Sequence, residues 1–248
     1  MGRPILIALS AATLLAGGAT SSFAQASGDG YLFHRPDVTL SVRGGYSRAD
    51  AKSDVFDEVT SNLTLDRGDF SGLTVGGDLA VPIANRVDLV LAGGYSRSSH
   101  KSEFRDFVDN NDLPIEQTTT FERIPVTANL RLNLSEPGRS IGSLAWIPSR
   151  VVPYVGAGVG AMHYRFRQQG DFVDFNTNGV FNSTVESSGW AFVGQAMAGV
   201  DYNFTSKLGL SLDARYLHAN GEPGAAFKGY DRIDLSGLTA TVGLSFRL

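Results

Sequence analysis

Histidine is the first residue type to test for chemistry, because it serves both as a metal ligand and as a general base. The chain has four histidines, His34, His100, His163 and His218, and no cysteine. No two of these histidines have the spacing of a metal-binding motif, so we expect no metal site. The lack of cysteine excludes thiolate ligands, disulfides and a cysteine nucleophile. We also expect no cofactor.

Charge and composition narrow the class of protein. Lys and Arg number 21 against 25 Asp and Glu, and this net charge of −4 argues against a nucleic-acid binder. The 29 glycines make up about 12% of the chain against a typical ~7%. Because hydrophobic residues reach 42% and aromatic residues 10%, the chain is too apolar to be disordered. A glycine-rich, aromatic, strand-forming protein remains.

The first 24 residues have the pattern of a secretory signal peptide. Arg3 supplies the positive charge, an apolar run extends from Ile5 to Leu15, and Ser22-Phe23-Ala24 provides the cleavage site. The apolar run is about half of the ~20 residues that a membrane-spanning helix needs. We therefore expect export, with cleavage after Ala24, and no helical anchor.

The clearest structural signal is the alternation of apolar and polar residues at the C-terminus. Leu238, Ala240, Val242, Leu244, Phe246 and Leu248 share one face, and the residues between them share the other. A period of two is typical of a β-strand, whereas an amphipathic helix needs apolar residues three and four apart.

Seven further segments alternate in the same way, which makes eight predicted strands. They begin near Val38, Leu73, Val87, Ile124, Pro153, Trp190 and Leu208. Short turns at 83–85 and 205–207 and a longer connection at 135–150 alternate with long polar connections near 48–69, 98–119, 167–188 and 218–233. Short turns at one end and long loops at the other are typical of an outer-membrane barrel.

One face of the predicted strands is apolar, and the other carries the charges. A closed eight-stranded barrel is only just wide enough for its own side chains, so the apolar face is expected to contact lipid. The charges then lie inside, four acidic and four basic, where they can pair; an unpaired charge there costs several kcal/mol. The predicted interior network consists of Arg43, Asp78, Asp88, Arg131, Asp201, Asp213, Arg215 and Arg247.

Aromatic residues cluster where the strands are expected to leave the membrane, as in the girdles of membrane barrels. Four tyrosines end alternate strands just before long loops, and one tryptophan opens another strand in phase with its lipid face. The predicted girdle consists of Tyr46, Tyr95, Tyr164, Trp190 and Tyr216.

Other aromatic residues need separate explanations. Phe70 and Phe121 are out of phase with their strands and would reach the girdle only through β-bulges. The long loops carry acidic and aromatic residues in alternation at 104–109 and 171–175. We expect these aromatics to extend the hairpins beyond the membrane; an adhesive or ligand-binding surface is the alternative.

Several motifs carry a family resemblance: the glycine-rich run 153–160, Ala-Gly-Val-Asp-Tyr at 198–202 and Ala-Arg-Tyr at 214–216. With them the sequence resembles the small eight-stranded outer-membrane β-barrel proteins of Gram-negative bacteria (OmpA/OmpX-like, outer membrane protein beta-barrel domain). The resemblance covers about 37–248. Members of this group are variously structural, adhesive or of unknown role, so the resemblance implies architecture rather than activity.

The last strand is similar to the signal by which such barrels are recognised by the insertion machinery. Thr241, Gly243, Phe246 and Leu248 occupy its positions. Leu248 departs from the usual final phenylalanine or tryptophan, which is expected to weaken this recognition.

One stretch, residues 215–222, locally resembles outer-membrane lipid A deacylases, which have histidine, serine and glutamate near the outer rim of an eight-stranded barrel. That chemistry needs a serine nucleophile activated by the histidine. Here Ala219 and Asn220 follow His218 where the serine is expected. We therefore predict no catalytic residue, and we interpret His218 as a residue of the rim.

The sequence thus predicts an all-β protein: an eight-stranded antiparallel transmembrane β-barrel with short periplasmic turns and long extracellular loops. The segments are a signal peptide at 1–24, a periplasmic segment at 25–36 and the barrel at 37–248. We expect a monomer with a structural or interaction role and a side-chain-plugged interior. Its expected partners are lipopolysaccharide and other outer-membrane lipids, periplasmic chaperones and the insertion machinery. A narrow channel or conduit for small molecules, hydrophobic ones included, is the first alternative, and a lipid A-modifying outer-membrane enzyme is the second.

Overall fold

The computed structural model describes residues 31–109, 112–142, 145–174, 179–224 and 229–248. The predicted signal peptide and residues 25–30 of the predicted periplasmic segment lie outside these ranges. Within them, no helix is both long enough and apolar enough to cross a membrane.

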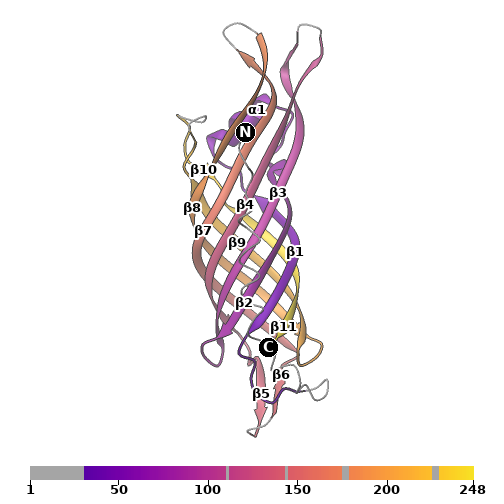
Figure 1. The fold of residues 1–248 in the computed structure, drawn as a ribbon, viewed down its shortest axis with the longest axis vertical. Helices are drawn as coiled ribbons and strands as arrows, with labels where there is room; N and C mark the ends of the chain where they lie inside the picture. Colours follow the sequence, from indigo (N-terminus) through magenta and orange to yellow (C-terminus); the bar gives the residue numbers. More distant parts are fainter. Residues whose placement is uncertain (1–30, 110–111, 143–144, 175–178, 225–228) are drawn as a thin grey trace, which may run out of the picture.

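Eight long antiparallel strands form the body of the molecule (Figure 1). They are β1 (Thr39–Ala49), β2 (Gly72–Pro82), β3 (Val87–Val108), β4 (Pro114–Asn133), β7 (Val151–Asp174), β8 (Gly179–Asn203), β9 (Leu208–Gly221) and β11 (Gly237–Arg247). Each strand pairs with its neighbours along the chain, β8 pairs with β9, and β11 pairs back with β1. The ladder of pairings therefore returns to its start, and the predicted eight-stranded barrel is confirmed.

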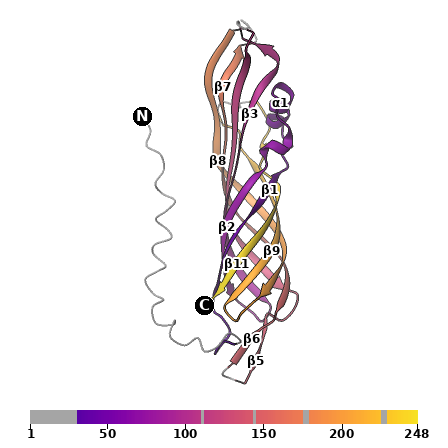
Figure 2. The same cartoon turned by 90° about the vertical axis from the view of Figure 1, so that its right-hand side faces the viewer.

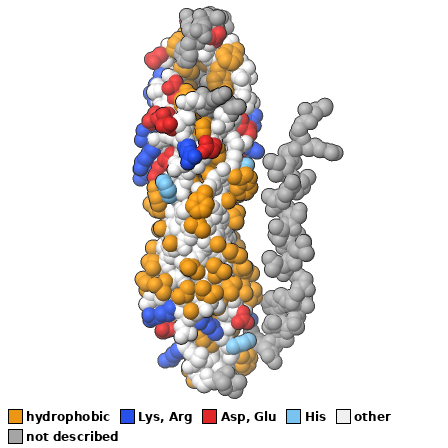
Figure 3. Space-filling view, turned by 90° about the vertical axis from the view of Figure 1, so that its left-hand side faces the viewer, with side chains coloured by type: hydrophobic (Ala, Val, Ile, Leu, Met, Phe, Trp, Pro, Cys, Tyr) orange, Lys and Arg blue, Asp and Glu red, His pale blue; other side chains and the backbone are white. Residues whose placement is uncertain are grey.

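The strands present the faces that the alternation predicts. Val42, Leu73 and Phe192 point outward and are 74%, 77% and 72% exposed, whereas residues next to them in sequence point inward. On the face drawn in Figure 3, apolar side chains form a broad band in the half of the molecule that carries the short turns, with charged residues gathered above and below it. Such a band is the outer surface that lipid requires.

Four strands are much longer than a membrane crossing. A tilted strand spans the bilayer with about 9–11 residues, but β3, β4, β7 and β8 have 22, 20, 24 and 25 residues. The connections expected as loops near 98–119 and 167–188 are therefore mostly strand. β4 pairs with β7 as far as Gln117 and Gly170, so the two hairpins form one curved sheet that rises beyond the barrel (Figure 1).

The remaining connections contain short elements. The connection between β1 and β2 holds α1 (Asp54–Asn62) and η2 (Arg67–Phe70), and α1 lies beside the extended strands (Figure 2). At the opposite, periplasmic end, β5 (Gly138–Ile141) and β6 (Ala145–Pro148) form a small hairpin. The two-residue β10 (Ile233–Asp234) pairs with the end of β9.

Candidate functional site

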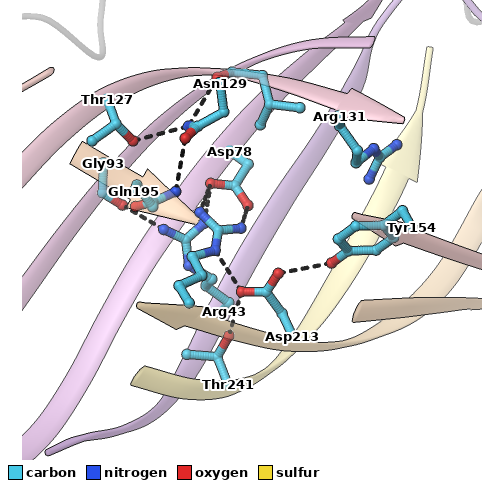
Figure 4. A network of polar contacts seen from close by, with 12 residues as sticks. Arg43, Asp78, Gly93, Thr127, Asn129, Arg131, Tyr154, Gln195, Asp213 and Thr241 are labelled. Carbon is cyan, nitrogen blue, oxygen red and sulfur yellow. Dashed lines mark hydrogen bonds and ion pairs between the residues drawn. The ribbon is translucent and has the colours of Figure 1, made fainter. Parts of the chain in front are cut away.

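The periplasmic half of the barrel interior is filled by charged side chains. Arg43 and Arg215 both form ion pairs with Asp78, and the Arg215 Nη2–Asp78 Oδ2 distance is 2.6 Å. Arg215 also pairs with Asp213 on its own strand, 2.5 Å from Nε to Oδ1. These groups come from β1, β2 and β9, so the cluster ties β9 to two strands with which it does not pair (Figure 4).

A second cluster is centred on Arg131 of β4. Its guanidinium lies 2.8 Å from Asp88 of β3 and 3.2 Å from Asp201 of β8. Tyr154 of β7 joins the two clusters, because its hydroxyl donates to Asp213 at 2.8 Å while its ring lies 4.8 Å from the Arg131 guanidinium carbon (Figure 4). Buried charges are stable when they are paired and hydrogen-bonded in this way.

Arg247 is the one predicted member that is not in an ion pair among the described residues. It donates a hydrogen bond to the Asn203 side chain instead. The remaining seven predicted charges lie together inside the barrel.

A layer of amides lies on the extracellular side of these charges. Asn129 donates to the Thr127 hydroxyl and accepts from Gln195 of β8, both at 2.9 Å. Close packing against this layer requires glycine at one position of the glycine-rich run in β7. A Cβ added at Gly158 would lie 2.3 Å from Asn129 Oδ1. A cavity of about 30 Å³ near this layer is lined by Arg43 and Arg215 among others, and that volume exceeds the ~10–15 Å³ that a buried water molecule needs.

Four of the five predicted girdle residues point outward, and one points into the barrel. Tyr46, Tyr95, Trp190 and Tyr216 are all exposed on the outer surface. The expectation for Tyr164 is wrong, because its side chain points inward and is only 1% exposed. In β7 the even-numbered residues face inward, and the glycines before Tyr164 conceal this parity in the sequence.

The extracellular half of the interior is apolar. Phe70 and Phe121 do not reach the girdle through bulges. They are buried in an interior cluster with Phe56 of α1 and Phe166 of β7, with the Phe56 ring 4.7 to 5.6 Å from the other three ring centroids. β4 keeps one register with β3 on both sides of Phe121, so there is no bulge at this residue. Phe121 simply belongs to the inward-facing residues of β4.

Arg123 lies between the charged half and the apolar half of the barrel interior. It is 3% exposed, and its guanidinium donates to the carbonyls of Leu235 and Ser236 and to the Ser47 hydroxyl at 2.8 to 3.3 Å. It therefore holds the connection before β11 against the wall. The sequence analysis did not identify this residue, although its odd-numbered position in β4 places it inside.

A pocket of about 220 Å³ lies at the outer end of the apolar half, between α1 and the extended sheet. Its lining is mostly apolar and comes from α1 and the segment after it, from β3, β4, β7 and β8, and from Tyr230. The lining residues are Val55, Glu58, Val59, Asn62, Leu63, Phe104, Gln117, Gln168, Phe172, Val173, Val185 and Tyr230. We call this the outer pocket. None of its residues was singled out as a site in the sequence, although the loop aromatics include Phe104 and Phe172.

His218 lies on the outer surface, as expected for a rim residue, and it contacts a serine that is remote in sequence. Ser236 Oγ is 3.2 Å from His218 Nδ1 and 3.3 Å from the Ala219 amide. No carboxylate lies at ion-pair distance from His218 among the described residues. In the same residues, no three His, Asp or Glu side chains are grouped so as to hold a metal ion.

The predicted assembly signal lies on the edge where β11 meets β1. Thr241 and Gly243 face the interior, and Leu248 is exposed. Phe246 lies opposite Leu40 of β1. The Leu248 amide donates to the Val38 carbonyl at 2.9 Å, so the final residue continues the pairing.

Comparisons with solved structures return outer-membrane barrels. Neisserial surface protein A is 15% identical with a TM-score of 0.46, covering 85% of this chain and 96% of that one. OprG from Pseudomonas aeruginosa is 15% identical with a TM-score of 0.45, covering 88% and 100%. Ail, the attachment invasion locus protein of Yersinia pestis, is 14% identical with a TM-score of 0.42, covering 86% and 99%.

No curated protein sequence matches this chain. One family model does, and it covers residues 10–246, nearly the whole chain and all eight barrel strands. The protein therefore belongs to the outer membrane protein beta-barrel domain family.

Proposed function

We propose that this protein is an outer-membrane barrel with an interaction role, which binds a small apolar molecule in the outer pocket while its interior stays closed. The observation that carries the proposal is the pocket itself, about 220 Å³ and lined mainly by Val, Leu, Phe and Tyr side chains. An apolar cavity of ~150 Å³ already binds benzene in an engineered protein, so this pocket suits a molecule of one or two rings.

The closed interior supports binding rather than passage. Arg215 of β9 pairs with Asp78 of β2, and Arg131 of β4 pairs with Asp201 of β8, so these ion pairs reach across the interior between strands that are not neighbours. An apolar molecule would have to break these pairs to travel along the axis, and breaking a buried pair is costly. The proposal therefore assigns the ligand a site at the extracellular end, and it includes no reaction.

The rest of the proposed role follows from the architecture. We propose that the chain is exported with cleavage after Ala24 and is inserted as a monomer with the help of periplasmic chaperones and the insertion machinery. The apolar band and the exposed girdle residues are suited to contact lipopolysaccharide and other outer-membrane lipids.

The proposal is tested by filling the pocket. Val185 lines it, whereas its neighbour Thr184 is exposed on the opposite face of β8. In lipid nanodiscs, calorimetric titration with 1-methylindole should show saturable binding to the parent protein and to Thr184→Trp, and no binding to Val185→Trp. Empty nanodiscs correct for partition into lipid, and heat-modifiable gel migration checks folding. Equal binding by both variants, or none by the parent protein, would contradict the proposal.

A further inference from the structure

Gln117 gives the outer pocket one polar feature that the apolar lining does not explain. Its side chain, on β4, is only 3% exposed and lines the pocket. The amide nitrogen donates to the Asp171 carbonyl at 2.8 Å. The amide oxygen, Oε1, is buried and has no hydrogen-bond partner among the described residues.

The orientation of this amide is fixed by its surroundings. Oxygen and nitrogen of a glutamine are assigned from the hydrogen bonds that they make. Exchanging them would place Oε1 against the Asp171 carbonyl, so two acceptors would face each other. The nitrogen must therefore point to Asp171, and the oxygen keeps an unused acceptor. This oxygen has almost no accessible surface in the unliganded molecule, so neighbouring side chains must shift for a ligand to reach it.

A second buried oxygen lies beside it. Thr119 follows Gln117 on the same inward face of β4, and its hydroxyl also lacks a hydrogen-bond partner among the described residues. Thr119 is paired in register with Gln168, which lines the pocket. Thr119 itself is outside the lining, so Gln117 alone carries the inference. Buried polar atoms are nearly always hydrogen-bonded in folded proteins, and of the described atoms without a partner only Gln117 Oε1 belongs to a residue that lines the pocket, which points to a group that enters it.

The chemical class of that group follows from the remaining lining. Phe104, Phe172, Val173 and Val185 offer only apolar contact. Glu58 lies at the pocket, with its carboxylate 2.5 Å from the Asn62 amide, and a carboxylate disfavours an anionic ligand. A cationic ligand is disfavoured as well, because burial of its charge among apolar side chains is costly. An acceptor within a mostly apolar wall therefore suits an uncharged molecule with a single O–H or N–H group.

We propose that Gln117 Oε1 selects ligands of this class, accepting a hydrogen bond from a phenolic, indolic or alcoholic donor on an otherwise apolar molecule. This inference rests on the proposed function and adds the ligand's polar group. A site that hydrogen-bonds a ligand group discriminates against the analogue that lacks it, because its own polar atom is then left unpaired.

The test compares indole with 1-methylindole, which differ by the N–H donor. We expect indole to bind the parent protein about tenfold more tightly, which corresponds to one hydrogen bond to a buried acceptor. Gln117→Met removes the acceptor with little change in size, so the ratio of the two dissociation constants should fall to about one. Thr184→Trp, outside the pocket, should keep the tenfold preference.

The outcomes separate the two proposals. If the parent protein binds both ligands equally, the role of Gln117 is wrong while the apolar pocket remains. If it binds neither, the proposed function itself fails. Because the parent protein alone gives these results, they do not depend on the folding of Gln117→Met. A preference for indole that persists in folded Gln117→Met would also overturn the inference.

Discussion

At the residue scale, the interior charges were predictable because a strand places alternate residues on opposite faces. Once the lipid face was assigned, the charges had to lie inside, and a narrow barrel brings them together. The partners within the network were not predictable. Arg215 contacts Asp78, which is 137 residues away in sequence, and such a contact depends on register and tilt rather than on local pattern.

Asp78 is the residue on which the first network depends most, because it accepts ion pairs from two arginines, Arg43 and Arg215. Asp78→Asn removes the negative charge that faces two buried guanidinium groups, so their positive charges are less well paired. Removal of one partner from a buried pair costs about 3–5 kcal/mol. Urea unfolding of the barrel in lipid vesicles, followed by tryptophan fluorescence, should show a loss of this size.

Asp57→Asn is the matched control for this measurement. Asp57 pairs with Arg67 at 2.5 Å, but both side chains are 52% exposed. Exposed pairs contribute about 0–1 kcal/mol, so this variant should unfold almost like the parent protein. Equal losses in the two variants would show that the barrel interior does not depend on the Asp78 pairs.

At the element scale, the strands were more predictable than their connections. The alternation in β11 and β4 gave both the strands and their faces. The apolar residues of the connections were harder to interpret, because a single inward residue such as Phe70 resembles a girdle residue out of phase. α1 carries Val55, Phe56 and Val59 on one face, and this spacing is helical, but the segment is too short to stand out.

α1 is held in place by its phenylalanine, which is fully buried among Phe70, Phe121 and Phe166. Truncation of a buried phenylalanine to alanine costs about 3–5 kcal/mol. Because Phe56 is the residue of α1 that contacts three other rings of the cluster, Phe56→Ala should loosen α1 while the barrel stays folded. Trypsin cleavage after Lys52 or Arg67 should become faster, and heat-modifiable migration should be retained.

Ser61→Ala serves as the control, since Ser61 is exposed and its hydroxyl donates to the Glu58 carbonyl within the same helix. Its cleavage rate should match that of the parent protein. If Phe56→Ala is cleaved no faster than Ser61→Ala, α1 is held by contacts other than the aromatic cluster.

At the scale of the whole molecule, two layers of side chains, one after the other along the barrel axis, close the interior. The charged network lies in the periplasmic half, and the apolar cluster with α1 lies in the extracellular half. The balance of interior charges predicted the first layer. The second layer was not predictable, because it depends on a loop helix that folds back into the mouth of the barrel.

This arrangement predicts that the two closures act independently. The refolded protein should give no discrete current steps in a planar bilayer. Replacing residues 52–66 by glycine and serine removes α1 but leaves Asp78, Arg131 and Arg215 in place, so this variant should also stay silent. Steps in the parent protein would mean that water passes between the ion pairs. Steps only in the variant would mean that α1 alone closes the barrel, and that the charged network leaves an aqueous path beneath the outer pocket.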